Sequence, residues 1–196
     1  MPPFAQDVLD FWFGPPADPG HLLTRPQWFR KDAAFDAQVG QRFGPLIERA
    51  LQGGIDAWVA PPLAALPALA RVIVLDQFPR NAFRGTARSF AGDAMALQTA
   101  RALVASGLDR DLTGVQRQFA YLPFEHAEDL AHQRTAVQLF EQLGRDEPAL
   151  AGLLEWARRH HDIVARFGRF PHRNALLGRA SSDDEIEFLK QPGSGF

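Results

Sequence analysis

Residues 74–87 read Val-Leu-Asp-Gln-Phe-Pro-Arg-Asn-Ala-Phe-Arg-Gly-Thr-Ala. This first polar stretch leaves an apolar helix, and a break at Pro79 is expected to gather its polar side chains in one short loop. A second polar stretch, residues 169–180, repeats the pattern Arg-Asn-Ala-x-x-Gly-x-Ala after Phe-Pro. Because the chain builds the same polar pattern twice, we expect both copies to lie at one edge of the fold and to serve one pocket.

The composition indicates one domain spanning residues 1–196. With 46% hydrophobic and 22% charged content, a chain of 196 residues can bury a sizeable core, and no shift in composition divides it. Sixteen Phe stand against one Tyr, so rings without polar groups are expected to fill much of that core. Residues 191–196 are expected to form a flexible tail, because glycine-rich ends lose much entropy on ordering. The alternative is that Phe196 docks in a surface cleft.

Charge and residue usage exclude several classes of partner and site. The net charge of −2 gives no excess of Lys and Arg, so we expect neither nucleic acid nor an anionic membrane as a partner. The absence of cysteine excludes a disulfide framework, a thiolate zinc site and a cysteine nucleophile. No uncharged apolar run approaches the roughly 18 residues of a membrane span, and the cytoplasm is the expected compartment.

Hydrophobic periodicity predicts an all-α fold. Apolar residues recur at helical spacing, and no segment alternates with the period of two that strands require. Seven or eight helices are expected, packed as antiparallel pairs across short connections. They cover residues 4–13, 32–51 and 67–78, then a helix from Ser89 to a stop at Gly107, then 124–143, 147–167 and a short helix from Ser182, with a short helix or turn at 113–120.

Local signals set several helix boundaries. Asp32 is expected to cap one helix, and Ser182 with Glu185 forms the capping box of another. Pro79 is expected to end the third helix, Ser89 to open the next, and Pro123 to stand as the first residue of a new helix.

The arginines of the two polar stretches are candidates for holding an anion. Guanidinium groups bind carboxylate or phosphate through paired hydrogen bonds, and a helix opening at Ser89 would favour negative charge at its amino end. The alternative is that Asn81 and Arg84 only satisfy backbone carbonyls at the segments they connect.

A second group of polar residues follows Tyr121. Glu125 and Asp129 stand four residues apart, which would place both acids on one helical face, with His132 one turn further on. These groups could ligate a metal, but a di-iron bundle needs two Glu-x-x-His repeats and the chain has a single Asp129-x-x-His132. We therefore expect no metal and no cofactor, and we expect Glu125 and Asp129 to pair with arginines of the polar stretches. One histidine of the pair His160-His161 must face the apolar side of its helix, and such a histidine is more often a bonded core residue than a ligand.

Five separated motifs resemble one known family. They are Val8-Leu9-Asp10-Phe11-Trp12-Phe13-Gly14, Trp28-Phe29-x-Lys31-Asp32, residues 75–86 of the first polar stretch, Tyr121-Leu122-Pro123-Phe124-Glu125-His126-x-Glu128-Asp129, and Arg166 to Asn174. Together they are similar to the bacterial family called domain of unknown function 924, over almost the whole chain. The resemblance implies an all-α fold similar to tetratricopeptide-repeat arrays, and it implies no activity.

Three hypotheses of function follow. The first is a pocket for a small anionic molecule, in a binding protein or in an enzyme that uses Glu125 or His126 as acid or base. The second is a helical-repeat module that grips a carboxylate of a protein partner. The third is a buried structural network with no ligand. Besides the two catalytic candidates, the residues expected to bind the ligand are Asp76, Gln77, Arg80, Asn81, Arg84, Tyr121, Asp129, Arg169, His172, Arg173 and Asn174.

Overall fold

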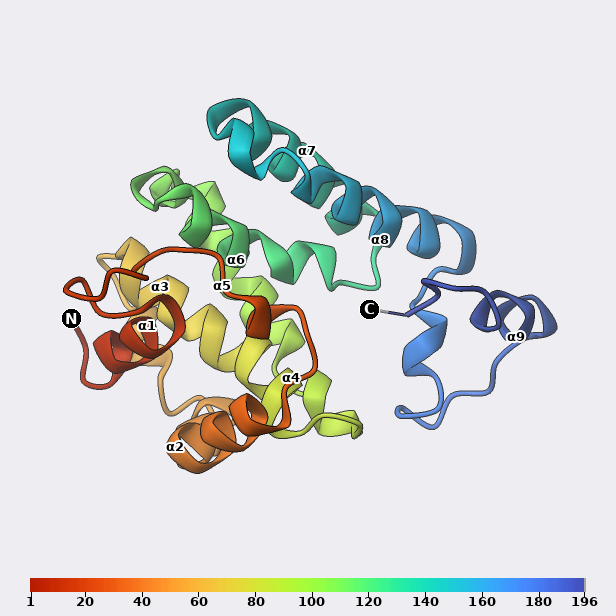
Figure 1. Ribbon diagram of the computed structural model, residues 1–196, viewed down its shortest axis with the longest axis horizontal. Coiled ribbons are helices and arrows are strands. Elements are labelled where there is room, and N and C mark those ends of the chain that lie inside the picture. The colour runs from red at the N-terminus through yellow and green to blue at the C-terminus, as the bar shows by residue number, and fades with distance from the viewer. Residues whose placement is uncertain (196) are drawn as a thin grey trace.

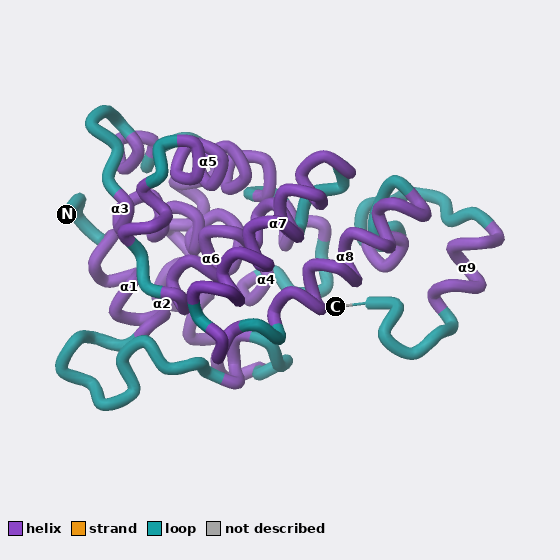
Figure 2. The backbone as a smooth tube through the Cα atoms, turned by 90° about the horizontal axis from the view of Figure 1, so that it is seen from above, coloured by secondary structure: helices purple, strands orange, loops and turns teal. Residues whose placement is uncertain are grey.

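Helices form every regular element of the computed structural model, which describes residues 1–195 (Figures 1 and 2). Within that range the predicted all-α fold is confirmed, with eight helices when α3, the π segment and α4 are counted as one. The helices are α1 (Ala5–Phe13), α2 (Ala33–Leu51), α3 (Ala65–Val72), the π segment (Ile73–Gln77), α4 (Phe78–Ala82), α5 (Asp93–Ala105), α6 (Gly114–Glu125), α7 (Leu130–Asp146), α8 (Leu153–Phe167) and α9 (Asp183–Leu189).

The helices pack in two connected groups. In the first, α1 and α5 pack on α3, and α2 packs on α4. In the second, α7 packs along both α6 and α8, and Figure 1 shows α7 and α8 as a layer beside α6. The segment that follows α8, residues 168–195, lies beyond the end of this layer and includes α9 (Figure 1). This pairing of sequential helices is compatible with a repeat array, and the likeness to tetratricopeptide repeats stays a prediction.

One main core spans both groups of helices, and two smaller hydrophobic clusters lie beside it. The main core is rich in aromatic rings: Phe78 of α4 lies with its ring centroid 4.6 Å from that of Phe43 and 5.8 Å from that of Trp12. A smaller core forms around Val164 and Phe170, where α8 meets residues 168–195. Hydrogen bonds of Asp93 and Glu128 link the main core to the core around Phe170.

The first polar stretch is helical as far as Ala82, so the expected break at Pro79 is wrong. The chain passes from α3 through the π segment into α4, and Pro79 lies in the first turn of α4. The backbone N–H of Phe78 donates to Ile73 O, five residues earlier, which widens the helix just before the proline. Pro79 has no N–H to donate to Leu75 O, and the wider turn accommodates that loss without ending the helix.

Gly92 lets the chain approach the π segment closely. A Cβ atom at Gly92 would stand 2.1 Å from Leu75 O and 2.8 Å from Leu75 C, which no side chain allows. The residue caps α5 from this position. Contact between the two backbones therefore fixes where α5 begins relative to the π segment.

Two further helix boundaries differ from the expected ones. Ser89 does not open a helix, because its hydroxyl donates to Thr86 O at 2.6 Å and α5 begins only at Asp93. Pro123 does not begin one either: a capping box of Thr113 and Gln116 starts α6, and Pro123 lies in its last turn. The predicted caps Asp32 and Ser182 are confirmed, since each side chain accepts from backbone N–H groups of the helix it starts.

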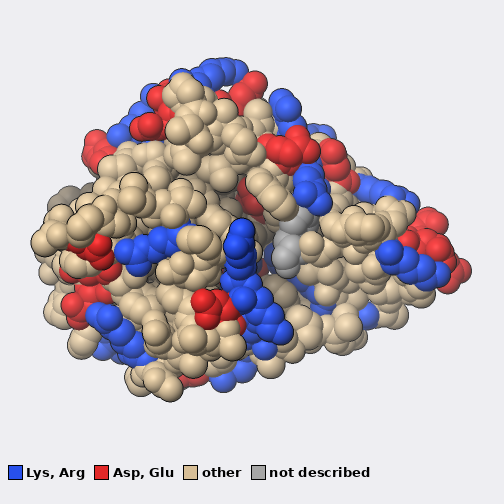
Figure 3. Space-filling model, viewed as in Figure 1, with Lys and Arg blue, Asp and Glu red and all other residues tan. Residues whose placement is uncertain are grey.

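Charged side chains of both signs cover the surface, and the end of the chain turns back on the protein. Among the described residues no helix is both long and apolar enough to cross a membrane. Lys and Arg side chains alternate with Asp and Glu over the face in Figure 3, without one large patch of either sign. Residues 191–195 fold back on the protein, with Ser194 only 9% exposed. Docking of Phe196 concerns a residue outside those the structure describes.

Replacing Gly92 with Ala tests the close approach. We expect Gly92→Ala to lower the free energy of unfolding by about 2–3 kcal/mol, because the new methyl group meets backbone rather than a movable side chain. Gly44 is the matched control, since it lies inside α2 and a Cβ there has no neighbour within 4 Å. Gly44→Ala should raise the free energy of unfolding by about 0.5–1 kcal/mol. Urea denaturation measures both, and an equal response of the two variants would contradict the constraint.

Candidate functional site

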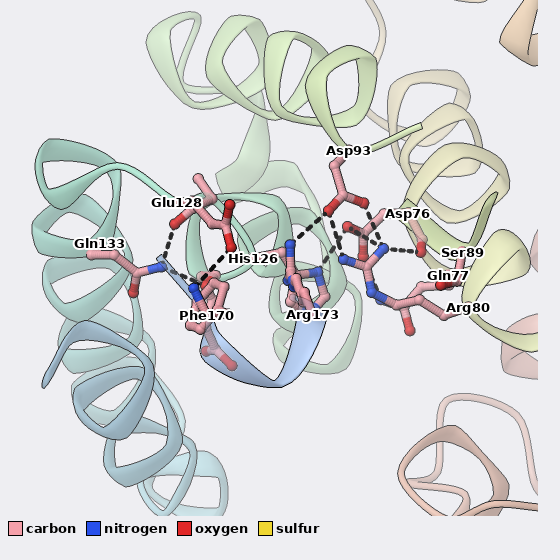
Figure 4. A network of polar contacts seen from close by, with 12 residues as sticks. Asp76, Gln77, Arg80, Ser89, Asp93, His126, Glu128, Gln133, Phe170 and Arg173 are labelled. Atoms are coloured by element: carbon pink, nitrogen blue, oxygen red, sulfur yellow. Dashed lines mark hydrogen bonds and ion pairs between the residues drawn. The ribbon is translucent and has the colours of Figure 1, made fainter. Parts of the chain in front are cut away.

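One carboxylate brings the two polar stretches together. Asp93, at the start of α5, accepts two hydrogen bonds from Arg80, at 2.8 and 3.0 Å, and one from Arg173 Nη1 at 3.3 Å. Figure 4 shows both arginines converging on it from different elements. Arg80 belongs to α4, and Arg173 ends the 3₁₀ turn Pro171–Arg173. The second polar stretch thus meets the first across an acid that lies in neither.

Arg173 is buried with incomplete compensation of its charge. Its guanidinium carbon lies 4.6 Å from the ring centroids of both Phe90 and Phe170, and the whole residue is 6% exposed. Its buried Nε has no hydrogen-bond partner among the described residues. Burial, and next the charge of Arg80, lower the pKa of Arg173 to about 10. An anion beside Arg173 would oppose both effects by favouring the charged guanidinium.

Asp76 and His126 form a hydrogen-bonded dyad. Asp76 is fully buried in the π segment, and His126 follows the last residue of α6. Asp76 Oδ1 lies 2.8 Å from His126 Nδ1, and Asp76 Oδ2 accepts from Gln77 Nε2 at 2.5 Å. Burial opposes ionisation of Asp76, but the charge of Arg80 and the hydrogen bonds from His126 and Gln77 outweigh it and hold its pKa well below the usual range. Asp76 is therefore a carboxylate that can only accept hydrogen bonds.

The dyad fixes the tautomer of His126. Because Asp76 only accepts, the shared proton lies on His126 Nδ1, and Nε2 keeps the lone pair of the neutral ring. Burial and then Arg80 lower the pKa of His126, against the opposite effect of Asp76. His126 is consequently a neutral imidazole that is oriented to accept a proton at Nε2.

Glu125 precedes His126 and is a neutral acid. Burial, and then the charge of Asp76, raise the pKa of Glu125 to about 8. His160 Nδ1 lies 3.1 Å from Glu125 Oε1 and 2.9 Å from Trp156 O, to which it donates. Burial lowers the pKa of His160 to about 3, so this contact joins two neutral groups and is not an ion pair. The prediction that Glu125 pairs with an arginine is wrong.

A further acid ties the second polar stretch to the α6–α7 connection. Glu128 accepts from Arg179 at 2.5 and 2.9 Å and from the backbone N–H of Phe170 at 2.8 Å. Gln133 of α7 donates to the backbone oxygens of Glu125 and Ala127 at 2.6 and 2.7 Å, which holds the same connection in place (Figure 4). These bonds position His126 and Arg173 on opposite sides of the boundary between the cores.

Several predicted site residues lie elsewhere or serve the architecture. Asn81 and Arg84 both bind Asp36 of α2, and the carboxylate of Asp36 is 2.6 Å from Arg84 Nε. In residues 168–195, Arg169 and Asn174 bind Glu185 of α9. Both groups connect neighbouring elements through the carboxylates of Asp36 and Glu185, whereas the alternative expected Asn81 and Arg84 to satisfy backbone carbonyls.

Asp129 and Tyr121 are likewise outside the cluster. Asp129 caps α7 through a bond from the backbone N–H of His132 at 3.0 Å, and α6 has already ended, so it does not share a helical face with Glu125. Tyr121 donates to Asp109 at 2.6 Å, beside Arg117. Within the part of the chain that the structure describes, no three His, Asp or Glu residues are arranged to hold a metal ion.

Some members of the cluster were missed in the sequence. Asp93, Phe90 and His160 carry no local motif, and only their position after the first polar stretch or in the His-His pair of α8 marks them. Glu128 lies inside the motif from Tyr121 to Asp129. The spacing of Glu125 and Asp129 in that motif predicted a site without Glu128. The residues that the structure does bring together are Asp76, Gln77, Arg80, Glu125, His126, His172 and Arg173, joined by Asp93, Glu128, His160 and Phe170.

The neutral state of Glu125 predicts a loss of stability with rising pH. Above about pH 6.5 the unfolded chain has released this proton, while the native protein holds it up to a pKa of about 8. Raising the pH from 6.5 to 8 should therefore lower the free energy of unfolding by roughly 1–2 kcal/mol. Below about pH 6.5 the lowered pKa values of His126, His160 and His172 act in the opposite direction and mask the effect.

Urea denaturation at several pH values from 6.5 to 8 tests this, with Glu125→Gln as the comparison. The amide resembles the neutral acid and cannot ionise, so the variant should lose the slope and be the more stable protein at pH 8. An unchanged slope in Glu125→Gln would assign the titration to another group.

Comparison with known proteins places the chain in a family. The family described as bacterial protein of unknown function (DUF924) matches residues 8–193. The solved structure of the protein of unknown function ATU0120 from Agrobacterium tumefaciens is 41% identical, with a TM-score of 0.81, and the match covers 95% of this chain and 97% of that one. No curated protein matches significantly. The chain therefore belongs to the DUF924 family of bacterial proteins of unknown function.

Proposed function

We propose that the cluster binds a small carboxylate at Arg173 and transfers protons to and from it through His126 and Glu125. The observation that carries the proposal is the buried guanidinium of Arg173, whose Nε lacks a partner among the described residues beside a histidine held ready as a base. Buried charges are ordinarily paired through several hydrogen bonds, and Arg173 has one long bond to Asp93.

The charges of the cluster favour a singly charged ligand. Arg80 and Arg173 face Asp76 and Asp93, and Arg80 already binds both acids. Arg173 is thus the one of the two whose compensation is incomplete. A carboxylate adds one negative charge and accepts two parallel hydrogen bonds from a guanidinium, whereas a phosphate dianion would add a charge that Asp93 repels.

The acid and base have pKa values set apart by their surroundings. His126 is neutral, and its Nε2 can accept a proton from the ligand, while Asp76 stabilises the imidazolium that forms. Glu125 is protonated at neutral pH and can donate. Sites that place a base and an acid in this way support proton abstraction and return on one substrate, as in isomerisation. We infer that the reaction belongs to this class.

A thermal-shift screen of small carboxylates, with inorganic phosphate as the contrasting probe, tests binding. A carboxylate at 100 times its dissociation constant should stabilise the protein by about 2.7 kcal/mol, which corresponds to roughly 5–10 °C in a domain of this size. Arg173→Gln should abolish the shift. Arg84→Gln is the control, because Arg84 binds Asp36 away from the cluster and should retain it.

Deuterium exchange tests the proton transfer. Each carboxylate that binds is incubated with the protein in D₂O, and loss of a C–H signal in its NMR spectrum reports abstraction. His126→Gln should stop the exchange and leave the thermal shift in place. Equal shifts in wild type and Arg173→Gln would overturn the binding site, and exchange that persists in His126→Gln would overturn the base.

A further inference from the structure

The end of the chain returns from α9 toward the cluster. After Leu189 the backbone turns, with Ser194 N–H donating to Gln191 O at 3.2 Å and Ser194 Oγ donating to Leu189 O at 3.1 Å. Gly193 O accepts from Arg159 Nη2 of α8 at 3.4 Å. In Figure 1 the last described residues run beside the turn that carries Arg173. We call residues 191–195 the tail.

Glycine allows the tail to lie this close. Gly193 has φ 77°, in the left-handed region, and a Cβ there would stand 2.6 Å from Arg159 Nη2. A Cβ on Gly195 would lie 3.5 Å from His172 Cβ, which is ordinary contact. The tail is thus held through backbone atoms and one serine, and it buries no large side chain of its own among the described residues.

The position of Gly195 near His172 places the tail close to the anion site. His172 precedes Arg173, and its ring lies 5.7 Å from that of Phe170, which covers the Arg173 guanidinium. Burial, and next the charge of Arg173, lower the pKa of His172 to about 4, so its imidazole is neutral. Gly195 therefore lies beside the residue that precedes Arg173 in the turn.

We propose that the tail is a removable cover of the carboxylate site, and that a carboxylate must displace it to bind Arg173. The inference rests on the proposed function. It adds that the carboxylate must compete with a segment of the same chain for the site. Two features support displacement. The tail has few contacts to lose, and its four-residue run Pro192-Gly193-Ser194-Gly195 regains much backbone freedom on release.

Binding of benzoate and acetate to the wild type and to three variants tests the cover. One variant lacks residues 191–196. Gly193→Ala strains the tail at positive φ, and Gly107→Ala is its matched control, because Gly107 has φ 74°, no neighbour within 4 Å of a Cβ, and a place at the start of a distant turn. Isothermal calorimetry measures the affinities, and circular dichroism confirms that each variant is folded.

We expect the truncated protein to bind at least about ten-fold more tightly than wild type, Gly193→Ala to bind with intermediate affinity, and Gly107→Ala to bind as wild type does. A synthetic peptide of residues 190–196 should weaken carboxylate binding to the truncated protein. Equal affinities in wild type and truncated protein would overturn the cover and leave the proposed function standing. Absence of binding in every variant, including the truncated one, would overturn the proposed function together with the cover.

Discussion

The cluster depends on the hydrogen bonds that the Asp93 carboxylate accepts from two arginines. Asp93 binds Arg80 from α4 and Arg173 from the turn after α8, segments 93 residues apart that belong to different cores. Two like charges can approach only where an acid stands between them. Removing Asp93 would leave two buried cations facing each other, so this acid sets how near the second polar stretch can lie to the first. Its own position is set in turn by Gly92 against the π segment.

The π segment gives the cluster its other acid. An uninterrupted α-helix would have to end before Pro79, and Asp76 would then lie in its last turn, where helices fray. The wider turn keeps the chain helical and holds Asp76 fully buried against His126. A rigid, buried carboxylate fixes one tautomer of its histidine, whereas a carboxylate on a frayed turn would leave the ring free to rotate. The π segment therefore sets the geometry of the Asp76–His126 dyad.

Sequence reasoning predicted what local chemistry controls. The helix starts at Asp32 and Ser182 depend on side chains within three residues, and the all-α class depends on periodicity along each segment. The approach of Arg80 to Arg173 followed from the repeated pattern. The helical course through Pro79 and the choice of Asp93 could not be predicted, since the first depends on the wider π turn and the second on where Gly92 meets Leu75 in space. Arg84 and Arg169 were wrongly predicted to bind a ligand. An arginine that pairs with a structural acid and one that binds a ligand can occur in the same sequence pattern.

The small core around Phe170 has a consequence for cooperativity. Residues 168–195 join the rest of the protein through polar contacts of Glu128, Asp93 and Phe170 N–H, and through a small core that they share with α8. Such a unit can open while the main core stays folded, at a free energy set by those bonds and that small core. A ligand seated on Arg173 would add to that free energy from both sides of the boundary. Occupancy of the site would then be recorded as slower amide exchange throughout α9, a helix that touches no part of the ligand.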